Sequence, residues 1–266
     1  MINIENVSYK YKNGKNVLKN ISFFIKNGEI VTIVGKNGSG KSTIGKLISG
    51  ILKLKEGSIF IDGMDISKRK NRELISSKIG IVFQNPDSQI IFSNIKEEFS
   101  YITQDENIID DALKYVDMLE YKNKDLYYLS LGQKQRIMIA EVLAKKPQYI
   151  IFDEPTTMID SIGKVKIYKL IKKLKDEGYT IICITNLADE ILLADRTIIL
   201  NNGEIVEQIE KKELVEKSNI FEKYEIRIPT LLEILVKLKS NGIELDNNDV
   251  LTVDSLVKEL CVKMKK

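Results

Sequence analysis

The chain has 266 residues, of which 43% are hydrophobic and 30% charged, the balance of a folded globular protein rather than a disordered one. Lysine and arginine number 41 against 38 aspartates and glutamates, and a formal charge of only +3 argues against a nucleic-acid partner. The N-terminus has no apolar signal core, and no apolar run approaches the ~18–20 residues of a membrane span.

The two cysteines have neither a metal-binding spacing nor the pattern of a disulfide framework. Cys183 lies in the apolar run YTIICIT and is expected in the core, so we predict a reducing, cytosolic compartment. Because the sequence has no membrane span, any membrane association is expected to be peripheral, through a partner.

The first part of the chain, residues 2–34, alternates short β-like runs with Asn-Gly turns, which predicts an N-terminal antiparallel β subdomain. A glycine-rich loop follows. The stretch 41–50 then has helical spacing, with Gly50 as its expected C-cap. The predicted turns are Asn13-Gly14 and Asn27-Gly28.

The apolar runs IVTIV, YIIF and TIICIT lack alternation, as expected for strands buried on both faces of a mostly parallel sheet. Helical stretches lie between several strands, so the sequence predicts an α/β fold with a mostly parallel core sheet. Beyond the glycine-rich loop, the expected strands are 58–63, 79–84, 149–154, 180–185, 196–200 and, after the Asn202-Gly203 turn, 204–208.

Two stretches depart from this alternation. Residues from about 95 to 145 are polar and apolar at helical period, which predicts a helical subdomain inserted into the sheet domain. After about residue 217 come two amphipathic helices, the first ended by Gly242 and the second with Thr252 as N-cap. We therefore predict one main domain at 1–216 and a small C-terminal helical module at 217–266.

The glycine-rich loop GKNGSGKST matches the phosphate-binding pattern G-x-x-x-x-G-K-[ST], directly after a strand and before a helix. Its glycines let backbone N–H groups converge on phosphates, and the helix directs its positive dipole end at the same anion. Lys41 is expected to bridge the β- and γ-phosphates, and the Ser42 hydroxyl to ligate Mg²⁺. An incidental glycine-rich turn is the alternative, which the flanking strand and helix disfavour. The residues predicted to bind the nucleotide here are Gly35, Lys36, Asn37, Gly38, Ser39, Gly40, Lys41, Ser42 and Thr43.

Far downstream, an apolar strand at 149–154 ends in two carboxylates. Asp153 is expected to hold Mg²⁺ through water, and Glu154 to be the base that polarises the attacking water. Two acidic residues at the end of a strand are also typical of a solvated turn. The presence of a phosphate loop favours the catalytic interpretation.

Phosphate-loop folds host many functions, so more specific motifs are needed. Residues 129–136, LSLGQKQR, resemble the LSGGQ signature of ABC ATPases. Gln84 stands where that family has its Q-loop, Asp160 ends a segment like its D-loop, and Tyr11 takes the place of the ring that stacks on adenine. The chain therefore resembles the P-loop ATPase domain of ABC transporters over residues 11 to about 196.

The resemblance implies a mechanism in which two ATPase domains meet head to tail and close around Mg-ATP. Each ATP then lies between one phosphate loop and the partner's signature, so Ser130, Gly132 and Gln133 are expected at the γ-phosphate held by the partner. The family pattern also implies that Gln84 acts at the metal and at the attacking water, and that Asp160 belongs to the nucleotide site.

A narrower resemblance is to the ATPases of energy-coupling-factor importers of cobalt and vitamin type. It rests on the passage VFQNPDSQIIFSNIKEEF, on DEPTTMID, and on the tail from about 225 to 266, which helps such ATPases to pair. The resemblance implies a transmembrane scaffold protein that docks on residues 87–99 and, through it, a substrate-capture membrane protein. An ordinary surface loop and helix is the alternative for 87–99.

Two positions depart from the family pattern. Asn186 stands where ABC ATPases carry a histidine, and the chain contains no histidine at all. Asparagine can donate a hydrogen bond to the γ-phosphate but cannot carry a proton near neutral pH. Leu131 replaces the first signature glycine and can crowd the facing phosphate loop. Both changes are either neutral drift or, as we favour, signs of a subunit that pairs with a paralogue in two unequal sites.

The leading hypothesis is ATP hydrolysis coupled to uptake of a metal ion or vitamin. A regulatory subunit that binds ATP while its partner hydrolyses it is the first alternative; Glu154 argues against it, and Asn186 with Leu131 argues for it. The second alternative is a non-transport ABC ATPase acting on nucleic acid or ribosomes. The sequence disfavours this function because it has no tandem second cassette, coiled-coil insertion or basic tail. A homodimer and a heterodimer both remain open.

Overall fold

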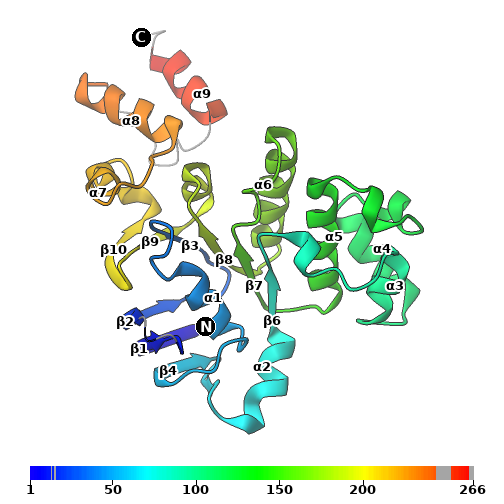
Figure 1. Ribbon diagram of the computed structural model, residues 1–266. Helices are drawn as coiled ribbons and strands as arrows, with labels where there is room; N and C mark the ends of the chain where they lie inside the picture. The colour runs from blue at the N-terminus through cyan, green and yellow to red at the C-terminus, as the bar shows by residue number, and fades with distance from the viewer. Residues whose placement is uncertain (13, 15, 244–252, 264–266) are drawn as a thin grey trace.

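A computed structural model describes residues 1–12, 14, 16–243 and 253–263 (Figure 1). The strands of this described part form two sheets, with the orders β2-β1-β4-β5 and β10-β9-β3-β8-β7-β6. The strands are β1 (Ile2–Lys10), β2 (Asn16–Ile25), β3 (Ile30–Val34), β4 (Glu56–Ile61), β5 (Met64–Asp65), β6 (Ile79–Val82), β7 (Tyr149–Asp153), β8 (Thr180–Thr185), β9 (Arg196–Asn201) and β10 (Glu204–Glu210). The helices are α1 (Lys41–Ile48), α2 (Arg72–Lys78), α3 (Ile95–Ser100), α4 (Glu106–Tyr115), α5 (Leu131–Ala144), α6 (Ser161–Asp176), α7 (Ser218–Lys223), α8 (Thr230–Ser240) and α9 (Val253–Lys263).

The larger sheet confirms the predicted α/β class. Strands β6, β7, β8, β3 and β9 run parallel, and only β10 pairs antiparallel, with β9. Every residue of β3, β7 and β8 is buried, as their unbroken apolar runs predicted. Because parallel strands all end at one edge of a sheet, the loops after β3, β6, β7 and β8 lie near one another.

The smaller sheet is antiparallel, as predicted, but its members come from both sides of α1. β1 pairs with β2 and with β4, which follows the helix in sequence. A hydrophobic cluster joins the two sheets through α1: it contains Ile4 of β1, Ile33 of β3 and Ile44 of the helix. The phosphate-loop helix is therefore packed between two sheets and is fixed relative to both.

The region from 95 to 145 is helical, as predicted. α3, α4 and α5 lie together at one side of the larger sheet (Figure 1). The described residues form no strand there, apart from a single bridge that pairs Asn94 with Asp125. Phe99 of α3 and Ile137 of α5 share one hydrophobic cluster with Phe152 of β7, so the helical region is anchored to the sheet.

The C-terminal helices α7, α8 and α9 lie beyond β9 and β10 (Figure 1). α8 ends before Gly242, whose φ of +78° explains why glycine follows this helix. The predicted N-cap Thr252 and the turn residue Asn13 lie outside the described residues. Leu232 of α8 shares a hydrophobic cluster with Val34 and Ile199 of the larger sheet, so the module packs on that sheet. The boundary at 216/217 stays a prediction.

Candidate functional site

The phosphate loop connects β3 to α1, in the context that the motif required. Its glycines are needed because other parts of the chain approach the backbone closely. A Cβ atom at Gly35 would lie 2.1 Å from the Leu200 carbonyl oxygen. Gly40 has a φ of +111°, and a Cβ there would lie 2.8 Å from the Val17 carbonyl oxygen. Close approach of other backbone therefore favours glycine at both positions, and the N-terminus of α1 that follows can receive an anion.

Lys41 curls back over this loop. Its Nζ donates to the carbonyl oxygens of Gly35 at 2.7 Å and Lys36 at 3.1 Å, and the side chain is buried. Burial lowers the pKa of Lys41, while the negative charges of Glu154 and Asp153 act in the opposite direction. The ammonium group is thus held inside the phosphate loop, with two carboxylates that favour its charged form.

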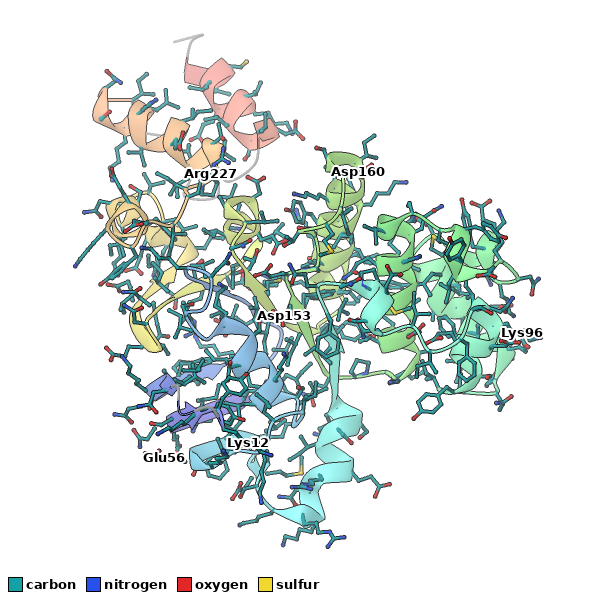
Figure 2. All side chains as sticks on the ribbon, in the orientation of Figure 1. Lys12, Glu56, Lys96, Asp153, Asp160 and Arg227 are labelled. Carbon is teal, nitrogen blue, oxygen red and sulfur yellow. The ribbon has the colours of Figure 1, made fainter. Side chains whose placement is uncertain are left out.

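Ser42 and Asp153 meet at the start of α1. The Ser42 hydroxyl donates to Asp153 Oδ1 at 2.8 Å, across 111 residues of sequence. Burial raises the pKa of Asp153, while the Ser42 hydrogen bond lowers it. Figure 2 places Asp153 near the centre of the molecule, at the end of β7. Two hard oxygen donors at this spacing fit Mg²⁺, which takes one or two protein oxygens together with substrate phosphates.

Glu154 follows β7 and meets Gln84, which follows β6. Gln84 Nε2 donates to Glu154 Oε2 at 3.0 Å, and the Thr157 hydroxyl donates to the same oxygen at 3.3 Å. Glu154 has a φ of +52°, and its N–H donates to the Ile184 carbonyl at 2.7 Å. A positive φ is uncommon outside glycine and marks a constrained position. The carboxylate is therefore held beside Gln84, at the mouth of the phosphate loop.

Asn186 follows β8 and lies next to the phosphate loop. Its Nδ2 donates to Asn37 Oδ1 at 3.2 Å. The side chain that replaces the family histidine is thus at the edge where β3, β6 and β7 also end. Its predicted hydrogen bond to the γ-phosphate stays a prediction.

The cavity beside the loop holds about 440 Å³ and is lined by Tyr11, Gln84 and Glu154 together with Lys41 and its neighbours. The Tyr11 hydroxyl lies 3.1 Å from Thr43 Oγ1, and its ring packs edge to face against Tyr9 with centroids 5.0 Å apart. Tyr11 is thereby held at one end of the cavity, where an adenine ring could stack on it. Adenine stacking stays a prediction.

The signature segment does not take part in this cavity: among the described residues that line it there is no member of 129–136. Ser130 instead caps α5, where its hydroxyl accepts from the N–H of Gln133 at 3.3 Å and the Gln133 side chain accepts from the N–H of Ser130. Leu131 begins the helix and is 37% exposed. The signature is therefore a rigid helix start that presents its polar end and Leu131 to the outside.

Asp160 has a structural role that sequence motifs did not indicate. It caps α6, and its Oδ1 accepts from the N–H of Gly163 at 2.8 Å. Figure 2 places Asp160 at the outer end of that helix. A residue that caps a helix can also contact a partner chain. The predicted contact of Asp160 with the nucleotide site stays a prediction.

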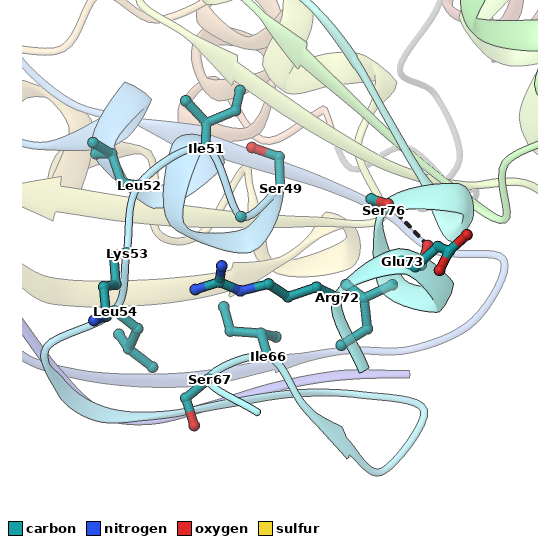
Figure 3. Close-up of a pocket in the computed structure, with 12 residues that line it drawn as sticks. Ser49, Ile51, Leu52, Lys53, Leu54, Ile66, Ser67, Arg72, Glu73 and Ser76 are labelled. Atoms are coloured by element: carbon teal, nitrogen blue, oxygen red, sulfur yellow. Dashed lines mark hydrogen bonds between the residues drawn. The ribbon is translucent and has the colours of Figure 1, made fainter. Parts of the chain in front are cut away.

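A second cavity lies at the far end of α1, where Arg72 reaches from α2 toward the loop of residues 51–54 (Figure 3). It holds about 620 Å³ and has an apolar wall of isoleucine and leucine side chains. None of the predicted site residues belongs to its lining among the described residues.

Sequence motifs did not single out four residues that the structure brings to the site. Val17 lines the cavity, Thr157 donates to Glu154, and Thr156 donates to the buried Glu190. Thr156 and Thr157 belong to the D-loop-like segment, and Glu190 belongs to the segment of Asn186. These three residues therefore lie within recognised motifs, but the motifs did not indicate what each residue does. Val17 had no local signal, because a β-strand residue far from the loop reaches it only in the folded chain.

Comparison with known proteins agrees with this geometry. Residues 18–157 match the family model described as ABC transporter. The chain is 41% identical to an energy-coupling factor transporter ATP-binding protein EcfA1 of Fusobacterium nucleatum, over 97% of each chain. It is 38% identical to the EcfA1 of Ligilactobacillus salivarius, over 98% of this chain and 95% of that protein.

Solved structures agree as well. CbiO1 of Clostridium perfringens, part of the ABC transporter complex CbiONQ, is 33% identical, with a TM-score of 0.75 over 88% of this chain and 97% of that one. The ATP-binding cassette MJ0796, a dimer in a post-hydrolysis state bound to ADP and Pi, is 31% identical, with a TM-score of 0.71 over 79% of this chain and 98% of that one. The chain therefore belongs to the ABC transporter ATPases and, among them, to the ATP-binding proteins of energy-coupling factor transporters.

Proposed function

We propose that this chain hydrolyses Mg-ATP in a closed pair with a paralogous ATPase, at the cytoplasmic face of the membrane, to energise import of a metal ion or vitamin. The observation that carries the proposal is the meeting of four loops at one sheet edge. There Gln84 lies 3.0 Å from Glu154, Ser42 lies 2.8 Å from Asp153, and Asn186 lies beside the phosphate loop. No helix among the described residues combines the length and the apolar character that a membrane span requires.

Binding follows from charge and backbone geometry. The loop N–H groups and the N-terminus of α1 receive the phosphates, and the Lys41 ammonium neutralises charge between the β- and γ-phosphates. Ser42 and Asp153 would hold Mg²⁺, and Gln84, which lies beside Glu154, would be a further ligand. The ion, when bound, offsets the charge of the β- and γ-oxygens during transfer.

Hydrolysis needs a base and an oriented water. Glu154 Oε2, held by Gln84 and Thr157, accepts a proton from the water that attacks the γ-phosphorus. Asn186 donates to the γ-phosphate oxygens as their charge redistributes. Lys41 is already held inside the phosphate loop, so little reorganisation is expected during the reaction.

A second ATPase is needed because this chain's own signature does not line its own cavity. In the closed pair, Ser130, Gly132 and Gln133 would face ATP held by the partner, and Asp160 would approach the same interface. The dimeric state of MJ0796 supports such an arrangement. Exposed apolar side chains of the C-terminal module, Ile234, Val253 and Val257, offer a further surface for pairing.

The two sites of such a pair are unequal, and replacing Asn186 tests this. We expect the chain alone to hydrolyse ATP slowly, and Asn186→His to raise the rate, because imidazole adds a donor that can carry charge where charge develops. The gain should be larger for the chain alone than beside a paralogue with its own histidine. Steady-state phosphate release, measured for both preparations, gives the comparison.

Leu131 can mask this gain in a homodimer by holding the signature away from the facing loop. Leu131→Gly is therefore combined with Asn186→His, and each single variant is the control for the double variant. A double variant no faster than wild type would mean that both residues are neutral drift and that the sites are equivalent.

Docking of the scaffold protein is proposed for residues 87–99. Ile91 is 65% exposed and Phe92 38% exposed, and both are presented by a loop whose N–H groups donate to the buried Glu98 carboxylate, Phe92 at 2.6 Å. Asp87 of the same segment pairs with Lys134 of the signature helix at 2.7 Å. An apolar helix seated on this loop would thus be linked to the signature.

Phe92→Asp should reduce recovery of the scaffold with this chain from solubilised membranes about tenfold or more, because a charge would replace an apolar contact worth roughly 1.5–3 kcal/mol. ATP binding by the isolated variant should be unchanged. Phe24→Asp is the matched control, since Phe24 has a similar exposure of 44% on the N-terminal β subdomain. Equal loss of the scaffold in both variants would remove residues 87–99 as its docking site.

The regulatory alternative has one observation in its favour, the presence of Asn186 and Leu131 at two positions of the composite sites. It predicts a chain that closes on ATP while hydrolysis occurs only at the partner's base. The near full-length similarity to energy-coupling factor proteins supports the transport hypothesis over a non-transport ATPase.

A further inference from the structure

Glu190 is a buried acid beneath the candidate site with no role in the proposed chemistry. It lies in a short 3-10 helix, Ala188–Leu193, four residues after Asn186, and its relative exposure is 0%. A carboxyl group in such a place is unfavourable unless hydrogen bonds compensate for the lost water. Its partners therefore indicate what the acid is for.

The side chain receives one hydroxyl hydrogen bond, from a threonine. Thr156 donates to Glu190 Oε1 at 2.5 Å and is itself buried. The Thr185 hydroxyl, which accepts from the N–H of Leu187 at 2.9 Å, lowers the pKa of the carboxyl group, and Glu190 Oε2 has no hydrogen-bond partner among the described residues. The main-chain carbonyl of Glu190 accepts from the Thr32 hydroxyl of β3 at 3.3 Å. Residue 190 is thus tied through its side chain to the segment after β7 and through its main chain to β3.

The two threonines belong to the segments that carry the proposed reacting groups. Thr156 comes two residues after Glu154, and Thr185 immediately precedes Asn186. The two segments follow the paired strands β7 and β8, and the hydrogen bond from the N–H of Glu154 to the carbonyl of Ile184 ends that pairing. The Glu190 carboxyl group adds a side-chain link between them, deeper in the molecule.

We propose that Glu190 is a positioning residue that holds the segment after Glu154 and the segment around Asn186 in register, so that both side chains face one γ-phosphate. It acts through its hydrogen bond with Thr156 and does not touch the nucleotide. The inference rests on the proposed roles of Glu154 and Asn186. A misplacement of about 1 Å between reacting groups can slow a reaction by roughly 100-fold, which is why such a link matters.

The chemistry of the acid suggests which substitution preserves the link. Burial raises the pKa of Glu190 to about 7, while the hydrogen bonds of Thr156 and Thr185 act in the opposite direction. A substantial share of the molecules therefore carries the neutral acid near pH 7. Glutamine has the shape of that neutral acid and keeps an oxygen that can accept from Thr156.

The test compares Glu190→Ala, Glu190→Gln and Thr156→Val in the full-length chain. Single-turnover hydrolysis and ATP affinity are measured separately, with thermal unfolding as the check on folding. We expect Glu190→Ala and Thr156→Val to slow hydrolysis about 10- to 100-fold while ATP affinity stays within about twofold. Glu190→Gln should retain most of the rate. The double variant Glu190→Ala/Thr156→Val should be no slower than the slower single variant, because both remove one link.

Thr180→Val is the matched control for Thr156→Val. Thr180 is also a buried threonine with one hydrogen bond, from the N–H of Gly28 at 2.9 Å, but it begins β8 at the end away from the site. It should lose stability without losing turnover per folded molecule. A purely structural role of Glu190 would instead lower unfolding temperature, affinity and rate together in all variants.

The outcomes separate this inference from the proposed function. If Glu154→Gln slows hydrolysis and folded Thr156→Val or Glu190→Ala does not, the positioning role is wrong and the site assignment stands. Additive effects of the two single variants would also overturn the positioning role. If Glu154→Gln leaves hydrolysis unchanged, the assignment of the base fails first. Should Glu190→Ala not fold, Thr156→Val and Glu190→Gln still decide the question.

Discussion

Lys41→Ala is expected to abolish useful binding of Mg-ATP. The ammonium group is buried in the phosphate loop and hydrogen-bonded to two of its carbonyl groups, so the triphosphate would lose its main cation at a place that water cannot fully replace. Removing one partner of a buried, hydrogen-bonded charge pair costs about 2–5 kcal/mol, or roughly 30- to 4,000-fold in affinity. Equilibrium binding of a fluorescent ATP analogue measures the loss.

Lys53→Ala is the control, because Lys53 is exposed in the loop after α1 and lies away from the phosphate loop. It should bind ATP like the wild-type chain. The unfolding temperature of both variants shows whether the fold is retained. Wild-type affinity in folded Lys41→Ala would contradict the assignment of the nucleotide site.

Glu154→Gln is expected to leave ATP bound and to slow hydrolysis by roughly 10²–10⁴, the usual contribution of a positioned general base. Glutamine has nearly the same shape and can still accept from Gln84 Nε2 and the Thr157 hydroxyl, so the loop should keep its geometry. The amide cannot take the proton of the attacking water. The ATP-bound pair should therefore accumulate, which size-exclusion chromatography with ATP detects.

Glu56→Gln serves as the control, since Glu56 begins β4 on the surface of the antiparallel sheet. It should change neither turnover nor the elution volume. Unchanged turnover of Glu154→Gln in the full complex would place the chemistry in the partner's site. The regulatory alternative would then describe this chain better.

The sequence by itself determined those parts of the site whose chemistry is local. The phosphate loop is nine consecutive residues, and its glycines, lysine and hydroxyls act through backbone geometry that a strand and a helix impose within a few residues. Strand runs such as IVTIV and the helical period of 95–145 were also local signals. A strand buried on both faces has an unbroken apolar run, whereas a helix buried on one face has apolar residues at helical spacing. These elements appear in the structure where they were predicted.

Only the tertiary structure decided how distant segments meet. Gln84, Glu154 and Asn186 are separated by tens of residues, and they converge because β6, β7 and β8 are neighbours in one parallel sheet. The strand order depends on crossover packing over the whole domain, which leaves no mark at any one position of the sequence.

The same reason explains the roles that motifs did not reveal. Asp160 matched a family motif, but its hydrogen bond to Gly163 is defined by the start of α6. Glu190 matched a motif position too, but whether a glutamate lies exposed or is buried between Thr156 and Thr185 depends on what packs over it. A sequence pattern specifies the side chain and its local conformation, whereas burial and hydrogen-bond partners are properties of the folded chain, and they decide what that side chain does.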